Sequence, residues 1–108
     1  MPSAESTGEG LEEKKRRMLL TIDLSLEVLG RVASTALRLS FKKVQKLEWE
    51  SIVDDPEPLE RHIKAVFSNG SVVLIDIINK NVCNEFGLPY TEGRGLVDCL
   101  KEALAAGK

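Results

Sequence analysis

Four side chains in this sequence belong to types that do acid–base, nucleophilic or anion-binding chemistry: His62, Asp76, Cys83 and Arg94. A histidine titrates near neutral pH and can act as a general base. Asp76 interrupts the apolar run 72–78, where a carboxylate is costly to bury without a partner. No spacing rule brings the four together. We therefore expect His62 at a sheet edge and Asp76 at a strand end, and no catalytic centre.

The cysteines and the glycine-rich segment before the last predicted helix give weak signals. Two cysteines and one histidine, without a C-x-x-C pair, are too few for a four-ligand zinc site. Cys99 has the spacing of a small core residue, and Cys83 follows Lys80, which would favour a thiolate. Residues 93–95 (Gly-Arg-Gly) precede a helix start, where N–H groups hold anions, but they match no phosphate-binding motif. We expect no metal and no cofactor, and a helix-entry loop with Thr91 as cap.

Charge is segregated along the middle of the sequence. The segment 31–46 contains five basic residues and no acid, and the segment 47–60 contains six acidic residues and no base. Patches of opposite sign steer association and suit the pairing of two copies about a two-fold axis. Neutralisation within one chain is the alternative. The candidate binding residues are Arg31, Arg38, Lys42, Lys43, Lys46, Glu48, Glu50, Asp76 and Arg94.

Length and composition are those of one soluble domain: 108 residues, 43% hydrophobic and 30% charged, with a net charge of -2. They exclude a fibrous chain, a disordered chain and a membrane bundle. No apolar segment resembles a signal peptide or is long enough to cross a bilayer, so we expect a cytoplasmic protein with reduced thiols. Residues 1–17, polar and then basic, are predicted to form a disordered tail, and residues 18–108 a single domain.

Hydrophobic periodicity predicts an α+β fold. Apolar and polar residues alternate over 20–28, which is typical of a strand with one buried face. The segment 27–41 fits a helix, which we favour, or a second strand. A further strand is expected near 45–53, before the proline-containing turn 54–58. The first alternative gives the element order β-α-β-β-β-α, and the second gives a mostly-β meander with a single C-terminal helix.

The second half of the sequence contains the clearest local patterns. Asn69-Gly70 between two apolar runs predicts a type I′ hairpin. Its second strand, 72–78, is apolar on both faces, so a lone chain of this length would have difficulty covering it. A long connection follows over 79–95. Helical spacing from Leu96 to Leu104 then predicts a C-terminal helix capped by Gly107. The expected architecture is a small antiparallel sheet with helices on one face.

Three classes of function follow from these patterns. The charge split and the doubly apolar segment 72–78 favour a non-enzymatic interaction or assembly subunit that associates with itself as a homodimer, or with another protein. The alternative is a nucleic-acid-binding module that uses the Lys and Arg residues of 14–17 and 31–46. Its weakness is the low aromatic content, 5%, beside the acidic segment. The third is a small enzyme or ligand-binding domain built on His62, Asp76, Cys83 and Arg94. No membrane partner is expected.

Overall fold

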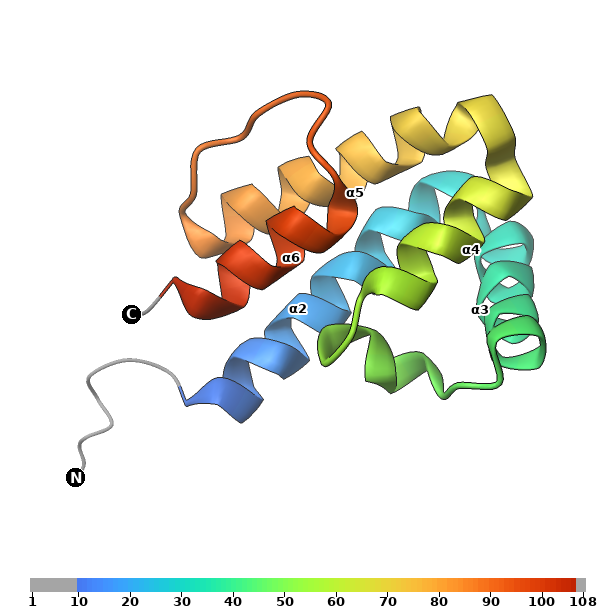
Figure 1. Ribbon diagram of the computed structural model, residues 1–108, viewed down its shortest axis with the longest axis horizontal. Coiled ribbons are helices and arrows are strands. Elements are labelled where there is room, and N and C mark those ends of the chain that lie inside the picture. Colours follow the sequence, from blue (N-terminus) through green and yellow to red (C-terminus); the bar gives the residue numbers. More distant parts are fainter. Residues whose placement is uncertain (1–9, 107–108) are drawn as a thin grey trace.

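The computed structural model describes residues 10–106, and all of its regular elements are helical (Figure 1). They are α2 (Leu11–Leu26), α3 (Arg31–Gln45), α4 (Glu57–Phe67), α5 (Ser71–Phe86) and α6 (Leu96–Ala105), joined by the 3-10 turns η1 (Glu27–Leu29), η2 (Trp49–Val53) and η3 (Ser68–Gly70). Residues 10–106 contain no strand. The predicted α+β fold and the mostly-β meander are therefore both wrong.

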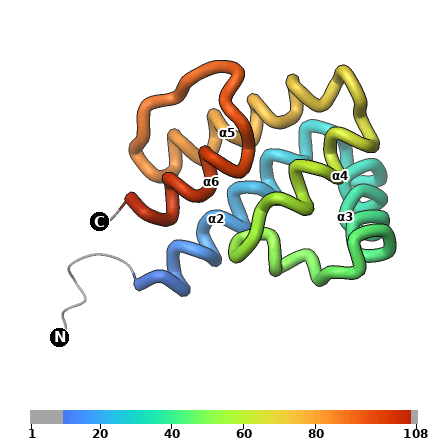
Figure 2. Tube along the Cα trace, viewed as in Figure 1, coloured from blue at the N-terminus to red at the C-terminus, as the bar shows by residue number. Residues whose placement is uncertain are grey.

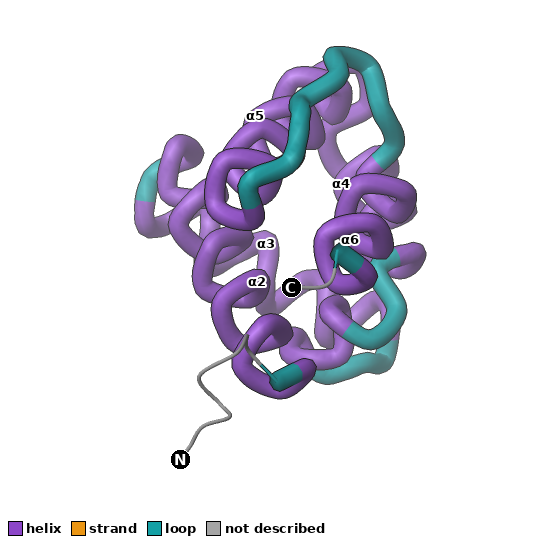
Figure 3. Tube along the Cα trace, turned by 90° about the vertical axis from the view of Figure 1, so that its left-hand side faces the viewer, coloured by secondary structure: helices purple, strands orange, loops and turns teal. Residues whose placement is uncertain are grey.

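Helices α2, α5 and α6 pack on one another, and α4 packs on α5 and α6 (Figure 1). Helix α3 stands at one end of the molecule, where it contacts α4, η1 and η2 (Figure 2). The segment 87–95 forms an irregular loop between α5 and α6 (Figure 3). No helix in the described part of the chain combines the length and apolarity needed to cross a membrane.

One continuous core joins the helices. Its fully buried large side chains include Met18, Ile22, Leu26, Phe41, Ile52, Leu59, Ile63, Ile78, Val82, Leu96 and Leu100. On α2, α4, α5 and α6 these residues recur at intervals of four, which places them on one face of each helix. Helix α3 contributes the fewest buried residues of the five helices: Ser34, Leu37 and Phe41. It is therefore the helix with the largest free surface.

Residues 20–28, predicted as a strand from their alternation, form the second half of α2 and the turn η1. The alternation results from two helical rows, each with a spacing of four residues. The row that is 0% exposed consists of Met18, Ile22 and Leu26. The second row, 56–62% exposed on the opposite side of α2, consists of Leu20, Leu24 and Val28. Because apolar residues lie on both sides of the helix, the sequence imitates the period of a strand.

The predicted hairpin and its apolar strand are also helical. Asn69-Gly70 lies in η3, where Gly70 has a φ of -70°, so the type I′ turn is wrong. The positive φ of this connection, 50°, belongs to Ser68. The segment 72–78 lies in α5, with Leu74, Ile75 and Ile78 in the core and Val72 and Val73 exposed. Helices of the same chain therefore cover its buried face. The predicted strand near 45–53 is mainly the turn η2.

Two helical predictions are confirmed, with shifted bounds. The favoured helix over 27–41 is observed as α3, Arg31–Gln45, which starts after Gly30 at a φ of 91°. The C-terminal helix is α6, and Gly107 lies outside the described residues. Residues 11–17, assigned above to a tail, form the first turns of α2, and residues 1–9 lie outside the described part. The predicted connection 79–95 starts later, because α5 continues to Phe86 and ends at Gly87 with a φ of 70°.

Candidate interaction surface

The basic run 14–17 is engaged within the fold. Lys14 Nζ donates to the carbonyl of Ala106 at 2.7 Å, Lys15 pairs with Asp54 at 2.6 Å, Arg16 with Glu13 at 2.7 Å and Arg17 with Glu85 at 3.0 Å. The hydrogen bond to Asp54 raises the pKa of Lys15. Lys14 is buried, and its ammonium group satisfies a carbonyl at the C-terminal end of α6, where the helix dipole favours a cation. This run is therefore not an unoccupied arm for phosphate groups.

The segregated charges are partly neutralised between neighbouring elements. Arg38 pairs with Asp23 of α2, and Lys42 pairs with Glu48, each at 3.4 Å. The other cations of this segment are Arg31, Lys43 and Lys46, which are exposed and have no acidic partner within residues 10–106. Glu50 is exposed on η2. All five predicted basic residues therefore lie on α3 or at its C-cap. Three of them, Arg31, Lys43 and Lys46, are exposed and have no acidic partner in the described part of the chain.

Asp76 and Arg94 line one small hollow of about 140 Å³, together with Glu60, Lys64 and the loop glycines. Both side chains make contacts that hold the loop 87–95 in place. Asp76 Oδ1 accepts from the Gly93 N–H at 3.3 Å, and Arg94 pairs with Glu102 and donates to the carbonyl of Asp98. Burial, followed by the charge of Asp76, raises the pKa of Tyr90 in the same loop. His62 and Cys83 do not line this hollow, so the four candidate groups do not form one site.

The anion at the N-terminus of α6 is the carboxylate of Glu60. Its Oε1 accepts from the Val97 N–H at 3.0 Å, and Lys64 pairs with it at 3.2 Å. The sequence led us to expect an anion near residues 93–95, with Thr91 as the cap. The N-cap is instead Gly95, which has no side chain to cap with, and a carboxylate from α4 fills that role. The helix start is thus occupied by a residue of the same chain.

Replacing Glu60 with alanine should lower the free energy of unfolding by about 1 kcal/mol, because the α6 N-terminus loses its cap and its favourable charge. Urea denaturation followed by circular dichroism measures this change. Glu60→Gln retains an acceptor oxygen and should cost less. Glu57→Ala, on the exposed side of the same helix, is the matched control. A loss in Glu57→Ala as large as in Glu60→Ala would contradict the capping role.

His62, predicted at an exposed sheet edge, is 3% exposed and belongs to a chain of hydrogen bonds. Arg61 donates to Gln45 Oε1 at 3.2 Å, which turns Gln45 Nε2 toward His62 Nδ1, 3.5 Å away. Ser40 Oγ lies 2.8 Å from His62 Nε2 and donates to the Leu37 carbonyl at 3.1 Å. The Leu37 carbonyl at the Ser40 hydroxyl and the Gln45 amide at Nδ1 together favour the tautomer with the proton on Nε2, which then donates to Ser40. This direction is opposite to that of a serine activated by a histidine base, so the contact is structural.

We expect stability to decrease in acid through His62. Burial lowers its pKa below the ordinary 6.5. Below about pH 6.5 the unfolded chain therefore binds a proton that the folded chain does not, and unfolding becomes more favourable as the pH falls toward the folded-state pKa. Denaturant unfolding at pH 7.5 and 5.5 should show a fall steeper in the wild type than in His62→Gln, by at most about 1.4 kcal/mol per pH unit. Equal slopes in the two proteins would contradict this role.

The two thiols, predicted to lie apart in a loop and on a helix, are in contact. Cys83 Sγ and Cys99 Sγ are 3.9 Å apart, and the side chains are buried in the interface between α5 and α6. Cys99 is thus a small core residue, as predicted. Burial raises its pKa to about 12, which keeps it protonated and makes it a poor nucleophile. Groups of three or more metal-ligating side chains are absent from the described residues.

Two rows of apolar side chains are exposed on the surface, and neither was predicted from the sequence as an exposed row. The α2 row consists of Leu20, Leu24 and Val28. It borders a hollow of about 320 Å³ between α2 and α5, lined by Thr21, Leu24, Asn81, Asn84 and Glu85. The α3 row consists of Val32, Ala36 and Leu39, of which Val32 is 84% and Leu39 is 66% exposed. Spacings of three and four residues place each row on one side of its helix. The sequence contains a signal for these surfaces, because each helix has a second set of apolar residues at helical spacing in addition to its core residues.

Comparisons with known proteins provide no relative to interpret these surfaces: no family model, no curated protein and no solved structure matches the chain.

Proposed function

We propose that this protein is a non-enzymatic interaction module that associates with itself through the α2 row. The observation that carries the proposal is the exposure of Leu20 and Leu24 on α2 and of Val28 in η1, at 56%, 59% and 62%, opposite the fully buried Met18, Ile22 and Leu26. Three large aliphatic side chains in one row are a recognisable docking surface for another helix. The geometry of His62 and the protonation of Cys99 count against an enzyme.

Charge makes the α2 row complementary to a second copy of itself. Arg16 precedes the row and is exposed, although it also pairs with Glu13, and the exposed Glu27 lies at the far end of the row, beside Val28. In an antiparallel pair with its two-fold axis near position 22, Leu20 meets Leu24 of the other copy. Arg16 then lies opposite the other copy's Val28, within reach of the neighbouring Glu27. Each end of the contact then contains one opposite-charge pair. Because the apolar row has only three residues on each copy, we expect a weak dimer, in the micromolar range.

The test measures self-association by sedimentation equilibrium. Leu24→Glu should weaken the dimer at least 100-fold, because each copy then places a carboxylate against the apolar Leu20 of the other copy. Val73→Glu is the matched control, since Val73 is 63% exposed on α5 and lies outside the row. Arg16→Glu and Glu27→Arg should each weaken the dimer, and the double variant should restore it. A wild type that stays monomeric at millimolar concentration would refute the proposal.

The same proposal places the protein in a reducing, cytoplasmic compartment. Its support is the thiol pair Cys83 and Cys99, which lies 3.9 Å apart and unbonded in the core. Nucleic-acid binding has weaker support, because all four basic residues of 14–17 are engaged within the chain, as are Arg38 and Lys42 of the segment 31–46.

A further inference from the structure

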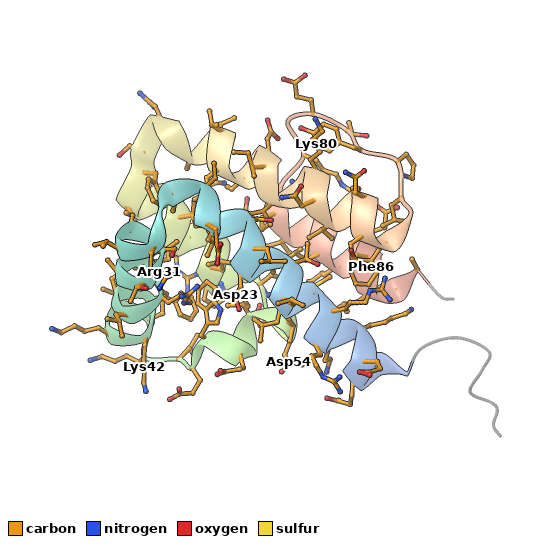
Figure 4. The ribbon with its side chains drawn as sticks, turned by 180° about the vertical axis from the view of Figure 1, so that it is seen from behind. Asp23, Arg31, Lys42, Asp54, Lys80 and Phe86 are labelled. Carbon is orange, nitrogen blue, oxygen red and sulfur yellow. The ribbon has the colours of Figure 1, made fainter. Side chains whose placement is uncertain are left out.

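Helix α3 presents a second surface that differs in chemistry from the α2 row. Its apolar row, Val32, Ala36 and Leu39, includes the most exposed large aliphatic residue of the described chain, Val32 at 84%. Only Ser34, Leu37 and Phe41 on the other side of the helix are buried. Figure 4 shows α3 at the end of the molecule, with Arg31 and Lys42 on it, while α2 runs beside it across the rest of the body. The outer side of α3 is therefore accessible to a partner without any rearrangement of the core.

The rim of this row is basic at both ends. Arg31 lies at the first position of α3, and Lys43 and Lys46 lie at its last turn and C-cap. These three cations have no acidic partner within residues 10–106. Lysines suit the C-terminal end of a helix, but an arginine at the N-terminus opposes the helix dipole. No side chain caps that N-terminus either. Both ends of the row are thus suited to negative charge from outside the described chain.

The α3 helix of a second copy does not fit this surface. An antiparallel pair of α3 helices would place Lys43 and Lys46 of one copy near Arg31 of the other, and a parallel pair would bring identical cations together. Like charges across an interface are destabilising. The sequence of α3 contains no acid to offset them. The occupant must therefore supply both aliphatic side chains for the row and carboxylates for its rim.

We propose that the outer face of α3 docks an acidic amphipathic helix of another protein. Its aliphatic side chains, spaced three and four residues apart, pack on Val32, Ala36 and Leu39, and its flanking glutamates or aspartates pair with Arg31, Lys43 and Lys46. Nucleic acid shares only the charge, and an anionic lipid surface offers negative charge together with an apolar phase. However, helices that bind lipid have a broader apolar face with aromatic residues. A phosphate backbone offers no apolar surface that could pack on the aliphatic row. This surface and this partner are separate from the α2 row.

The probe is a fluorescent synthetic helix of about 18 residues, with leucines at i, i+3, i+4 and i+7 and glutamates on the flanks; the matched peptide carries lysines in place of the glutamates. Fluorescence anisotropy should show micromolar binding of the acidic peptide in about 50 mM salt, weakened about 10-fold in 0.5 M salt by screening. The lysine peptide should bind at least 10-fold more weakly. Equal binding of the two peptides would overturn the proposal, as would tighter binding of phosphatidylserine vesicles or duplex DNA than of the acidic peptide.

Variants of α3 locate the site and test the charges. Leu39→Glu should abolish binding, whereas Val73→Glu, an equally exposed position on α5, should leave it unchanged. The double variant Lys43→Glu/Lys46→Glu should bind the lysine peptide in preference to the acidic one. A variant that fails to fold would lose binding of both peptides, so a reversed peptide preference cannot result from unfolding. Loss of preference without exchange would refute the charge assignment.

The Leu24→Glu variant separates this proposal from self-association. It should be monomeric and still bind the acidic peptide. Loss of peptide binding in this variant would overturn the assignment of a separate site on α3, whether or not the α2 contact exists.

Discussion

Phe41→Ala should lower the free energy of unfolding by about 3–5 kcal/mol, the largest effect we expect from a single substitution. The Phe41 ring is 0% exposed and meets Trp49 and His62 edge-on, at centroid distances of 5.4 and 5.8 Å. Alanine leaves a cavity at the point where α3 joins the body, and it removes both ring contacts. Since α3 buries only two other side chains, Ser34 and Leu37, Phe41 is the largest side chain that holds the docking surface in place.

Thermal unfolding followed by circular dichroism measures the effect. For a domain of this size the loss corresponds to a fall in Tm of about 15–30 °C. Val44→Ala is the matched control, because Val44 lies on the same helix and is 62% exposed; it should change stability by less than about 0.5 kcal/mol. Similar losses in the two variants would show that α3 is not anchored through Phe41.

Asp23→Ala should lower the free energy of unfolding by about 2 kcal/mol, through lost hydrogen bonds rather than a cavity. Asp23 Oδ1 accepts from Trp49 Nε1 at 2.9 Å and from Arg38 at 3.4 Å, so one carboxylate joins α2, α3 and η2. Without it, the half-buried indole N–H and the guanidinium of Arg38 lose their acceptor. The position of α3 relative to α2 depends on this contact, as does the angle between the two proposed surfaces.

Denaturant titration monitored by tryptophan fluorescence tests this expectation, since Trp49 is the single tryptophan. Asp23→Asn keeps an oxygen for the indole and should recover more than half of the loss. Arg38→Ala, which removes only the weaker contact, should cost less than Asp23→Ala. An Asn variant as unstable as the Ala variant would mean that charge, and not the indole hydrogen bond, carries the effect.

The amino-acid sequence by itself determined the helices whose apolar residues have a single period. Helix α6 has its core residues Leu96, Leu100 and Ala103 at spacings of three and four, and its other face is largely polar, so it was predicted correctly. The favoured helix over 27–41 is also observed, although α3 has a second, exposed apolar row beside its buried residues. The burial of Cys99 followed from its place on α6. The basic composition of 31–46 identified the cations that the structure gathers on one helix and its C-cap.

Only the tertiary structure decided the fold class and the partners of the polar groups. In α2 and α5 apolar residues occupy both the core side and the solvent side, so Leu20, Leu24, Val72 and Val73 turned helical patterns into apparent strands. Local preference gives no means of separating two superimposed rows, because burial is decided by which helices pack where. The cap of α6 by Glu60, from α4, depends on contacts between distant segments. So does the contact of Ser40 with His62. Such contacts leave no periodic trace in the sequence.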